Sequence, residues 1–128
     1  MGAKVDVMEP TRHDLVLSVT SHVPHLIAYT MVGVADDLER VTDKEVIEFS
    51  TGGFRDFTRI AASDPTMWHD IFLTNRDATL KILRRFQSDL TLLDQAIEHA
   101  DGDLLRTVFT RAKSARDYFT EILESRQK

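Results

Sequence analysis

The sequence has 128 residues, which is the size of one domain and enough to bury a hydrophobic core without crosslinks. It contains no cysteine, which excludes a disulfide framework and a thiolate metal site and fits a reducing, cytoplasmic compartment. A formal net charge of -5 argues against a general nucleic-acid binder, because affinity for phosphates depends on lysine and arginine.

The first residues carry a short strand signal. Val5 and Val7 alternate with polar neighbours in GAKVDVME, but a single strand needs a partner sheet to satisfy its backbone hydrogen bonds. This segment therefore resembles the end of something larger.

A helical pattern then runs from Pro10 toward Leu38. Pro24 lies inside it and should kink the helix or divide it in two, because the proline ring removes a backbone donor and clashes with the preceding turn. Polar residues interrupt its apolar runs before the roughly 20 residues that a membrane span needs. We therefore expect a protein that is neither inserted into a membrane nor exported.

Shorter elements follow in the middle of the chain. Thr42 and Glu45 have the spacing of a capping box, which predicts a short helix to about Phe49. The stretch STGGF interrupts this helix, and residues 54–62 are predicted to form another short one.

Two long helices are predicted after that. Asp64 and Pro65 have the pattern of an N-cap followed by proline at the first helical position. The apolar residues of this helix recur mostly every three or four positions: Trp68, Ile71, Phe72, Leu80, Leu83, Phe86, Leu90, Leu93 and Ile97. The stretch ADGD at 100–103 turns the chain, and the last helix carries Leu104, Leu105, Val108, Phe109, Ala112, Tyr118, Phe119 and Ile122. The sequence thus predicts an all-α fold apart from its first few residues.

One polar stripe is predicted along the first helix. Counting back from His25 by four, seven and eleven residues gives Ser21, Ser18 and Asp14, which share one face of a helix whose other faces are apolar. The stripe predicts either a lined cleft or hydrogen-bonded residues of the core or of an interface.

His22 and His25 also have the spacing that places two metal ligands on one helical face. The Glu-x-x-His repeats of di-iron bundles are absent, however, and Pro24 disturbs the geometry. These features disfavour a metal-binding bundle, and no metal is expected.

The stretch STGGFRDFTRIAASDPTMW contains a second candidate site. Paired glycines allow a backbone to approach a ligand or another chain closely. Arg55 and Arg59 lie one turn apart and could bind carboxylates near a helix start. The alternative is a solvated surface on which Asp56 pairs with one arginine, and Trp68 by itself is most simply a core residue.

Two stretches carry a resemblance to a known family. RHDLVLSVTSHVPHLIAYTMV at 12–32 and GGFRDFTRIAASDPTMWHDIFLTN at 52–75 resemble the C-terminal domain of the prephenate/arogenate (cyclohexadienyl) dehydrogenases of tyrosine biosynthesis. The similarity covers Gly2 to about Arg116. It implies that residues 1–9 are a remnant of the strand or linker between two domains, and that residues 10–128 form a helical substrate-binding and dimerisation domain. In that family an N-terminal Rossmann domain binds NAD or NADP.

The dinucleotide fingerprint is missing from this sequence. No G-x-G-x-x-G follows a strand anywhere in the chain, so we expect it neither to bind NAD or NADP nor to turn over prephenate or arogenate by itself. The regulatory ACT domain of some relatives is also absent. We expect a piece of a longer enzyme rather than a stand-alone relative.

The resemblance also assigns roles to residues. His25 matches the catalytic position and would accept a hydrogen bond from the substrate 4-hydroxyl, while hydride leaves that carbon for NAD(P)+ and the ring loses CO2 and becomes aromatic. This role requires a neutral imidazole. Arg59 matches the position that binds a substrate carboxylate. The remaining substrate-site assignments are Gly52, Asp56 and Trp68, which shape or brace the pocket, and Ser21 and His22 from the histidine motif. His22 has an orienting role, Trp68 could reach a neighbouring subunit, and His13 and Asp14 are placed where the two domains meet.

The main rival hypothesis is a non-catalytic helical module that dimerises or binds an aromatic ligand. The long helix from Pro65 and the last helix have enough apolar surface for an intertwined two-fold interface. We expect a homodimer, without nucleic acid or membrane as partner, whose core includes Leu80, Leu83, Phe86, Leu90, Phe109 and Phe119.

Overall fold

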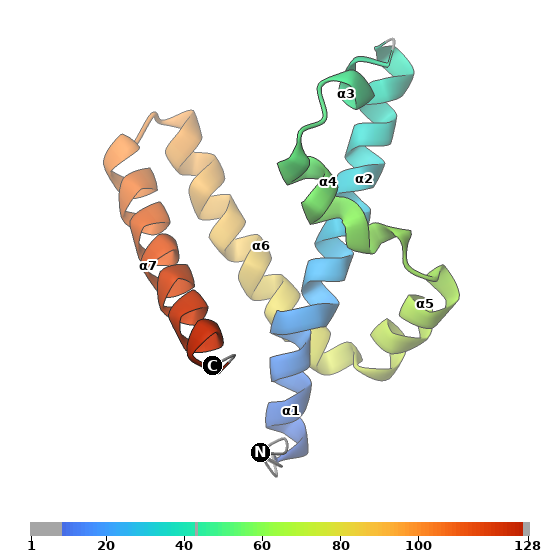
Figure 1. Ribbon diagram of the computed structural model, residues 1–128, viewed down its shortest axis with the longest axis vertical. Helices are drawn as coiled ribbons and strands as arrows, with labels where there is room; N and C mark the ends of the chain where they lie inside the picture. Colours follow the sequence, from blue (N-terminus) through green and yellow to red (C-terminus); the bar gives the residue numbers. More distant parts are fainter. Residues whose placement is uncertain (1–8, 43, 127–128) are drawn as a thin grey trace. The chain divides into compact units, whose positions relative to one another are not determined.

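The computed structural model describes residues 9–42 and 44–126, and the elements found there are helices (Figure 1). They are α1 (Pro10–Leu17), the π-helical turn η1 (Ser18–His22), α2 (Val23–Val41), α3 (Glu45–Glu48), α4 (Gly52–Thr58), the 3-10 turn η2 (Arg59–Ala62), α5 (Pro65–Thr74), α6 (Arg76–Glu98) and α7 (Gly102–Arg126). The all-α prediction is confirmed for these residues. The predicted strand signal at Val5 and Val7 lies outside them.

The chain divides into two compact units. The first ends at Arg84 and the second begins at Arg85, so the division falls within α6. The candidate histidines, the glycine pair and Trp68 all belong to the first unit. The second unit contains the rest of α6 and α7.

Helix type changes directly before Pro24. The Val23 N–H bonds to the Ser18 carbonyl five residues back, as in a π-helix, and Pro24 follows within the first turn of α2. Proline is tolerated in a first turn because its missing N–H has no partner to lose there. The predicted kink or division is therefore realised as a π-helical turn inside one continuous helical segment, Pro10–Val41.

This segment requires one correction to the sequence prediction. In the described part of the chain, Pro10–Val41 is one helical stretch of 32 residues that is long and apolar enough to cross a membrane. A core helix of a helical domain passes the same test of length and composition. Ser18, His22, Val23 and Ala28 are buried within the first unit, and the other residues of the segment are half-buried or exposed in the single chain.

The short helix predicted to about Phe49 is present as α3, with Phe49 as its C-cap, but the predicted capping box at residues 42–45 is wrong. Thr42 ends α2, and its hydroxyl donates to the Leu38 carbonyl at 3.1 Å. Lys44 occupies the N-cap of α3 with a φ of 67° and no side-chain cap. The carboxylate of Glu39 accepts from the Ile47 N–H at 3.1 Å instead, so a side chain of α2 caps α3.

The predicted helix over 54–62 begins earlier. Gly52 and Gly53 form the first turn of α4, so Ser50 and Thr51 are the interruption. Figure 1 shows α4 beside α2, and the two helices are in contact. The Tyr29 hydroxyl of α2 donates to the Ser63 carbonyl at 2.9 Å, which ties the end of η2 to α2.

The start of α5 was predicted correctly, but the single long helix was not. The Asp64 carboxylate accepts from the Thr66 N–H at 3.0 Å, and Pro65 stands at the first helical position. Asn75 then leaves the helical conformation, with φ −103° and ψ 41°, and separates α5 from α6. Its side chain bonds to the first helical segment instead, as described below.

The second unit is a pair of helix segments with an open apolar face. Ala100 takes a φ of 52° at the predicted turn, and the Asp101 carboxylate accepts from the Leu104 N–H at 3.1 Å, which caps α7. A groove of about 690 Å³ lies between the two segments and is lined by Leu90, Leu93, Asp94, Ile97, Glu98 and Phe109. Several of the predicted dimer-core residues are therefore exposed in a single chain, namely Leu90 (51%), Phe109 (56%) and Phe119 (56%).

Candidate active site

The His25 ring is held on two sides. Its Nδ1 lies 2.7 Å from the Ser21 carbonyl oxygen, which can only accept, so Nδ1 carries the proton. The ring also stacks on Trp68 with centroids 3.8 Å apart and planes at 23°. In the neutral ring, Nε2 is then an unprotonated acceptor.

The His22 ring lies deeper and has a different set of partners. It is buried, and its Nδ1 lies 3.0 Å from the side-chain amide nitrogen of Asn75. It meets Trp68 and Phe72 edge-on, at 5.9 Å and 6.4 Å between centroids. Burial lowers the pKa of His22, the nearby His25 lowers it further, and Asp14 opposes both effects. The neutral form of His22 is therefore favoured.

The predicted polar stripe is divided between two networks. Ser18 is fully buried, donates to the Asp14 carbonyl at 2.8 Å and lies 3.3 Å from the Asn75 amide nitrogen. Ser21 instead serves His25 through its carbonyl. The alternative of hydrogen-bonded core residues thus describes Ser18.

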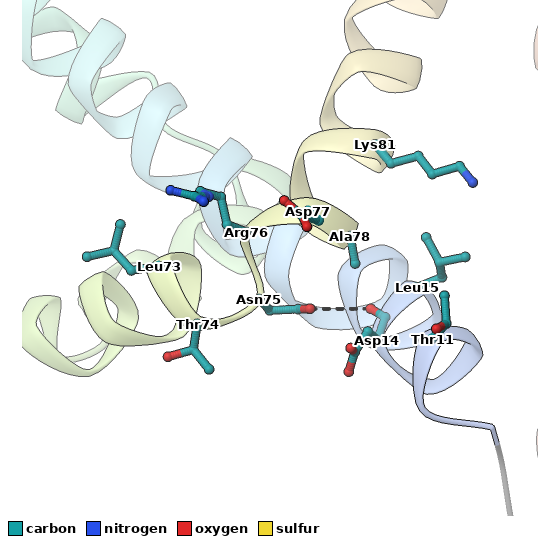
Figure 2. Close-up of a pocket in the computed structure, with 10 residues that line it drawn as sticks. All are labelled: Thr11, Asp14, Leu15, Leu73, Thr74, Asn75, Arg76, Asp77, Ala78 and Lys81. Atoms are coloured by element: carbon teal, nitrogen blue, oxygen red, sulfur yellow. Dashed lines mark hydrogen bonds between the residues drawn. The ribbon is translucent and has the colours of Figure 1, made fainter.

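A cleft does open at one end of the stripe. It holds about 430 Å³ and lies between α1 and the α5–α6 junction, lined by Thr11, Asp14, Leu15, Leu73, Thr74, Asn75, Arg76, Asp77, Ala78 and Lys81 (Figure 2). Figure 2 shows the Asn75 side chain directed toward Asp14 across its floor. Neither His22 nor His25 lines this cleft.

Trp68 is a core residue, as predicted from its side chain alone. It is 6% exposed and contacts both histidine rings. Its indole Nε1 is buried and has no hydrogen-bond partner among the described residues. The ring therefore acts as an apolar wall that orients the imidazoles.

Gly52, Asp56 and Arg59 are exposed residues of the same unit. Arg59 opens η2, which is packed against α2. Arg55, Asp56 and Arg59 are exposed, as the solvated-surface alternative expects, but within residues 9–42 and 44–126 Asp56 forms no ion pair with either arginine. The structure does not bring these three residues into hydrogen-bond contact with either histidine.

The described residues show no arrangement of side chains suited to bind a metal ion. Over the described ranges, no three His, Asp or Glu side chains gather where they could hold an ion. Nδ1 of His22 and Nδ1 of His25 already have partners in Asn75 and Ser21. His13 and Asp14, predicted at a domain junction, are exposed and lie 3.8 Å apart.

Sequence reasoning missed Asn75. Its amide nitrogen lies near Asp14, Ser18 and His22 and joins the α5–α6 junction to the first helical segment. The available signal was an asparagine within an otherwise apolar helical pattern, because asparagine is a common residue where helices end.

Comparison with known proteins identifies the family of this chain. Residues 9–111 match the family model described as "Prephenate dehydrogenase, dimerization domain". The chain belongs to this family.

Curated relatives of this dimerization domain are longer proteins. The chain is 41% identical over 116 residues to the cyclohexadienyl dehydrogenase of Zymomonas mobilis, covering 91% of the chain and 40% of that protein. It is 40% identical over 111 residues to the prephenate dehydrogenase of Bacillus subtilis, covering 87% and 29% respectively. The chain thus spans less than half the length of these relatives.

Solved structures show the same helical domain. Prephenate dehydrogenase from A. aeolicus in complex with hydroxyphenyl propionate and NAD+ is similar at 36% identity and a TM-score of 0.76, over 94% of this chain and 41% of that one. Synechocystis arogenate dehydrogenase has a TM-score of 0.81 at 21% identity, over 92% and 43%, which shows the shared fold alone. The resemblance inferred from the two sequence stretches is confirmed.

Proposed function

We propose that this chain is the substrate-binding and dimerisation part of an NAD- or NADP-dependent dehydrogenase of tyrosine biosynthesis in the cytoplasm. Its substrate would be prephenate or arogenate, and its product 4-hydroxyphenylpyruvate or tyrosine. The family membership and the names of the longer relatives support this assignment. Prephenate and arogenate belong to one substrate class, because they differ only in a keto or amino group on the side chain.

The residues of this chain do not fit a dinucleotide. The sequence has no G-x-G-x-x-G, and the described residues show no strand from which such a loop could lead into a helix. We therefore assign the cofactor to another domain of the complete enzyme. This chain would bind and orient the substrate and hold one proton acceptor.

The orientation of His25 is the observation that carries the proposal. The Ser21 carbonyl fixes the proton on Nδ1, which leaves Nε2 as an acceptor without any movement of the ring. A substrate hydroxyl that becomes a carbonyl loses its proton, and a positioned imidazole can accept it. Trp68 stacks on the His25 imidazole and limits its rotation, which keeps Nε2 in a fixed direction.

The substrate carboxylate would be bound by Arg59. Arg59 is exposed, and a guanidinium can bind a carboxylate through two parallel hydrogen bonds. Gly52 and Asp56 precede it on α4 and would shape that side of the pocket. We propose these three as substrate-site residues, with Trp68, Ser21 and His22 as supporting ones.

The rival function, a dimerisation module without catalysis, has two observations in its favour. The groove of the second unit leaves Leu90 and Phe109 half exposed, and the family is described as a dimerization domain. A homodimer is compatible with both functions, because an apolar two-fold interface can stand beside a substrate site.

A chimera separates the two functions. This chain would replace the matching C-terminal part of the Zymomonas mobilis relative, and steady-state kinetics would be measured with prephenate and arogenate. His25→Asn should lower kcat by about 10²–10⁴-fold, because asparagine cannot take a proton. Arg59→Ala should act mainly on KM, because a lost carboxylate contact weakens ground and transition states together.

His69→Asn is the matched control, because His69 is an exposed histidine of α5 whose ring has Asp70 as its polar partner among the described residues. It should leave both constants unchanged. If His22→Asn abolished kcat while His25→Asn did not, the catalytic assignment would belong to the other histidine. If neither variant mattered, the histidines would be packing residues and the dimerisation module would be favoured.

A further inference from the structure

The side chain of Asn75 can be oriented from chemistry alone. One of its two terminal atoms lies 3.4 Å from the Asp14 carbonyl oxygen, and a carbonyl oxygen only accepts. The Ser18 hydroxyl already gives its hydrogen to the same carbonyl, so Ser18 Oγ is also an acceptor toward Asn75. The atom that faces both must therefore be the NH2 group.

This orientation determines the protonation of His22. The same NH2 group lies 3.0 Å from His22 Nδ1, the shortest of its three contacts. Because the amide donates, Nδ1 must accept, and the proton of the neutral ring is on Nε2. A proton on Nδ1 would face another N–H and lose this hydrogen bond.

The two histidines of the motif are thus held as opposite tautomers. His25 carries its proton on Nδ1 and leaves Nε2 as an acceptor, whereas His22 carries its proton on Nε2 and offers a donor. Trp68 contacts both rings: it stacks on His25 and meets the His22 ring at 78°. A change in the tautomer or tilt of His22 would therefore also affect Trp68, the ring on which His25 stacks.

We infer that Asn75 is the positioning residue of this pair: its amide holds His22 as the Nε2-protonated tautomer and fixes the ring against Trp68, so that the site presents one donor and one acceptor to an oxygen-rich substrate. The use of the donor by a substrate rests on the proposed function. The tautomer itself does not.

The groups around His22 agree with this assignment. Phe72 and Trp68 are apolar neighbours, and the titratable side chains that act on the ring are His25 and Asp14. Asp14 is exposed and favours the charged ring, whereas His25 and burial disfavour it. Asn75 is the neutral partner that makes a hydrogen bond to the ring only when Nδ1 lacks a proton.

Nitrogen NMR of the histidine side chains tests the tautomer in the chain itself. The wild-type spectrum should show His22 protonated at Nε2 and His25 at Nδ1, with a scalar coupling across the hydrogen bond from the Asn75 amide nitrogen to His22 Nδ1. Asn75→Leu should abolish that coupling and release His22 to a mixture of tautomers. Asn75→Asp should reverse the preference, because a carboxylate accepts from a protonated Nδ1, and the His22 titration should move to higher pH.

Thr74→Val is the matched control, because Thr74 is the exposed neighbour of Asn75 and its side chain makes no hydrogen bond within the described residues. It should leave the spectrum of both histidines unchanged. A wild-type His22 protonated at Nδ1, or an Asn75→Leu spectrum identical to wild type, would overturn the inference. The wild-type spectrum decides this even where a variant does not fold.

The functional half is tested in the chimera. Asn75→Leu should lower kcat/KM about tenfold, the loss that a hydrogen bond of ordinary strength produces. An unchanged kcat/KM beside an altered tautomer would overturn the substrate role of the His22 donor. A wild-type chimera that folds but has no activity would count against the proposed function alone, because the NMR measurement needs no turnover.

Discussion

Replacing Trp68 should reveal how far the two histidines depend on one buried ring. The side chain is 6% exposed and lies against His22, His25 and Phe72. Removing a buried tryptophan side chain costs about 3–5 kcal/mol through lost burial and the cavity that remains. Trp68→Ala should therefore lower the free energy of unfolding by about 3–5 kcal/mol.

Trp68→Phe should be much milder for a specific reason. The indole Nε1 has no partner among the described residues, and a buried unpaired donor costs about 1–3 kcal/mol that phenylalanine does not incur. This gain offsets much of the lost area, so the variant should lie within about 2 kcal/mol of wild type. Phenylalanine also keeps an aromatic face for the His25 ring.

Urea unfolding measures both variants, at one fixed protein concentration because dimerisation would couple stability to concentration. Met67→Ala is the control, since Met67 is on the same helix but 47% exposed, and should cost less than about 1 kcal/mol. A loss below about 1 kcal/mol for Trp68→Ala would refute the view that this ring supports the histidine pair.

Three further predictions follow from the same geometry. Burial lowers the pKa of His22 in the folded chain below its usual 6.5, so as the pH falls the unfolded chain takes up the proton before the folded chain does. The urea midpoint should therefore be constant above pH 6.5 and fall below it. His22→Phe should reduce the dependence of the midpoint on pH. Gly52→Ala should not destabilise the chain, because an added Cβ meets nothing within 4 Å, and should raise the thermal midpoint. In the chimera the same variant should raise KM. A destabilised chain would contradict this prediction. Phe109→Asp should convert a dimer into a monomer in sedimentation experiments at micromolar concentration, because its side chain lies in the open groove, and a persistent dimer would place the interface elsewhere.

Much of the helical arrangement could be predicted because local rules and burial agree. The apolar period of α7 and the Asp64–Pro65 start of α5 are both strong signals, and both appear in the structure. The break at Asn75 was missed because the apolar period continues through it from α5 into α6. A single asparagine is a weak local stop, and here its conformation is stabilised by distant partners such as Ser18.

The site was harder to predict because its geometry depends on an uncommon turn. Counting in steps of an α-helix put Ser18 and His25 on one face, but the π-helical turn between Ser18 and His22 changes that phase. Ser18 consequently joins His22 at Asn75, and His25 turns to Trp68. The capping-box prediction at Thr42 failed because the cap of α3 is Glu39, a residue of another helix that a local pattern does not include.

The most direct test of the account compares prephenate-dependent reduction of NAD+ or NADP+ by the isolated chain and by the chimera with the nucleotide-binding part of the Zymomonas mobilis relative. We predict no turnover and no measurable nucleotide binding by the isolated chain, because it lacks a dinucleotide loop, and turnover that depends on His25 in the chimera. Turnover by the isolated chain, or a folded and dimeric chimera whose activity is unaffected by His25→Asn, would contradict the account.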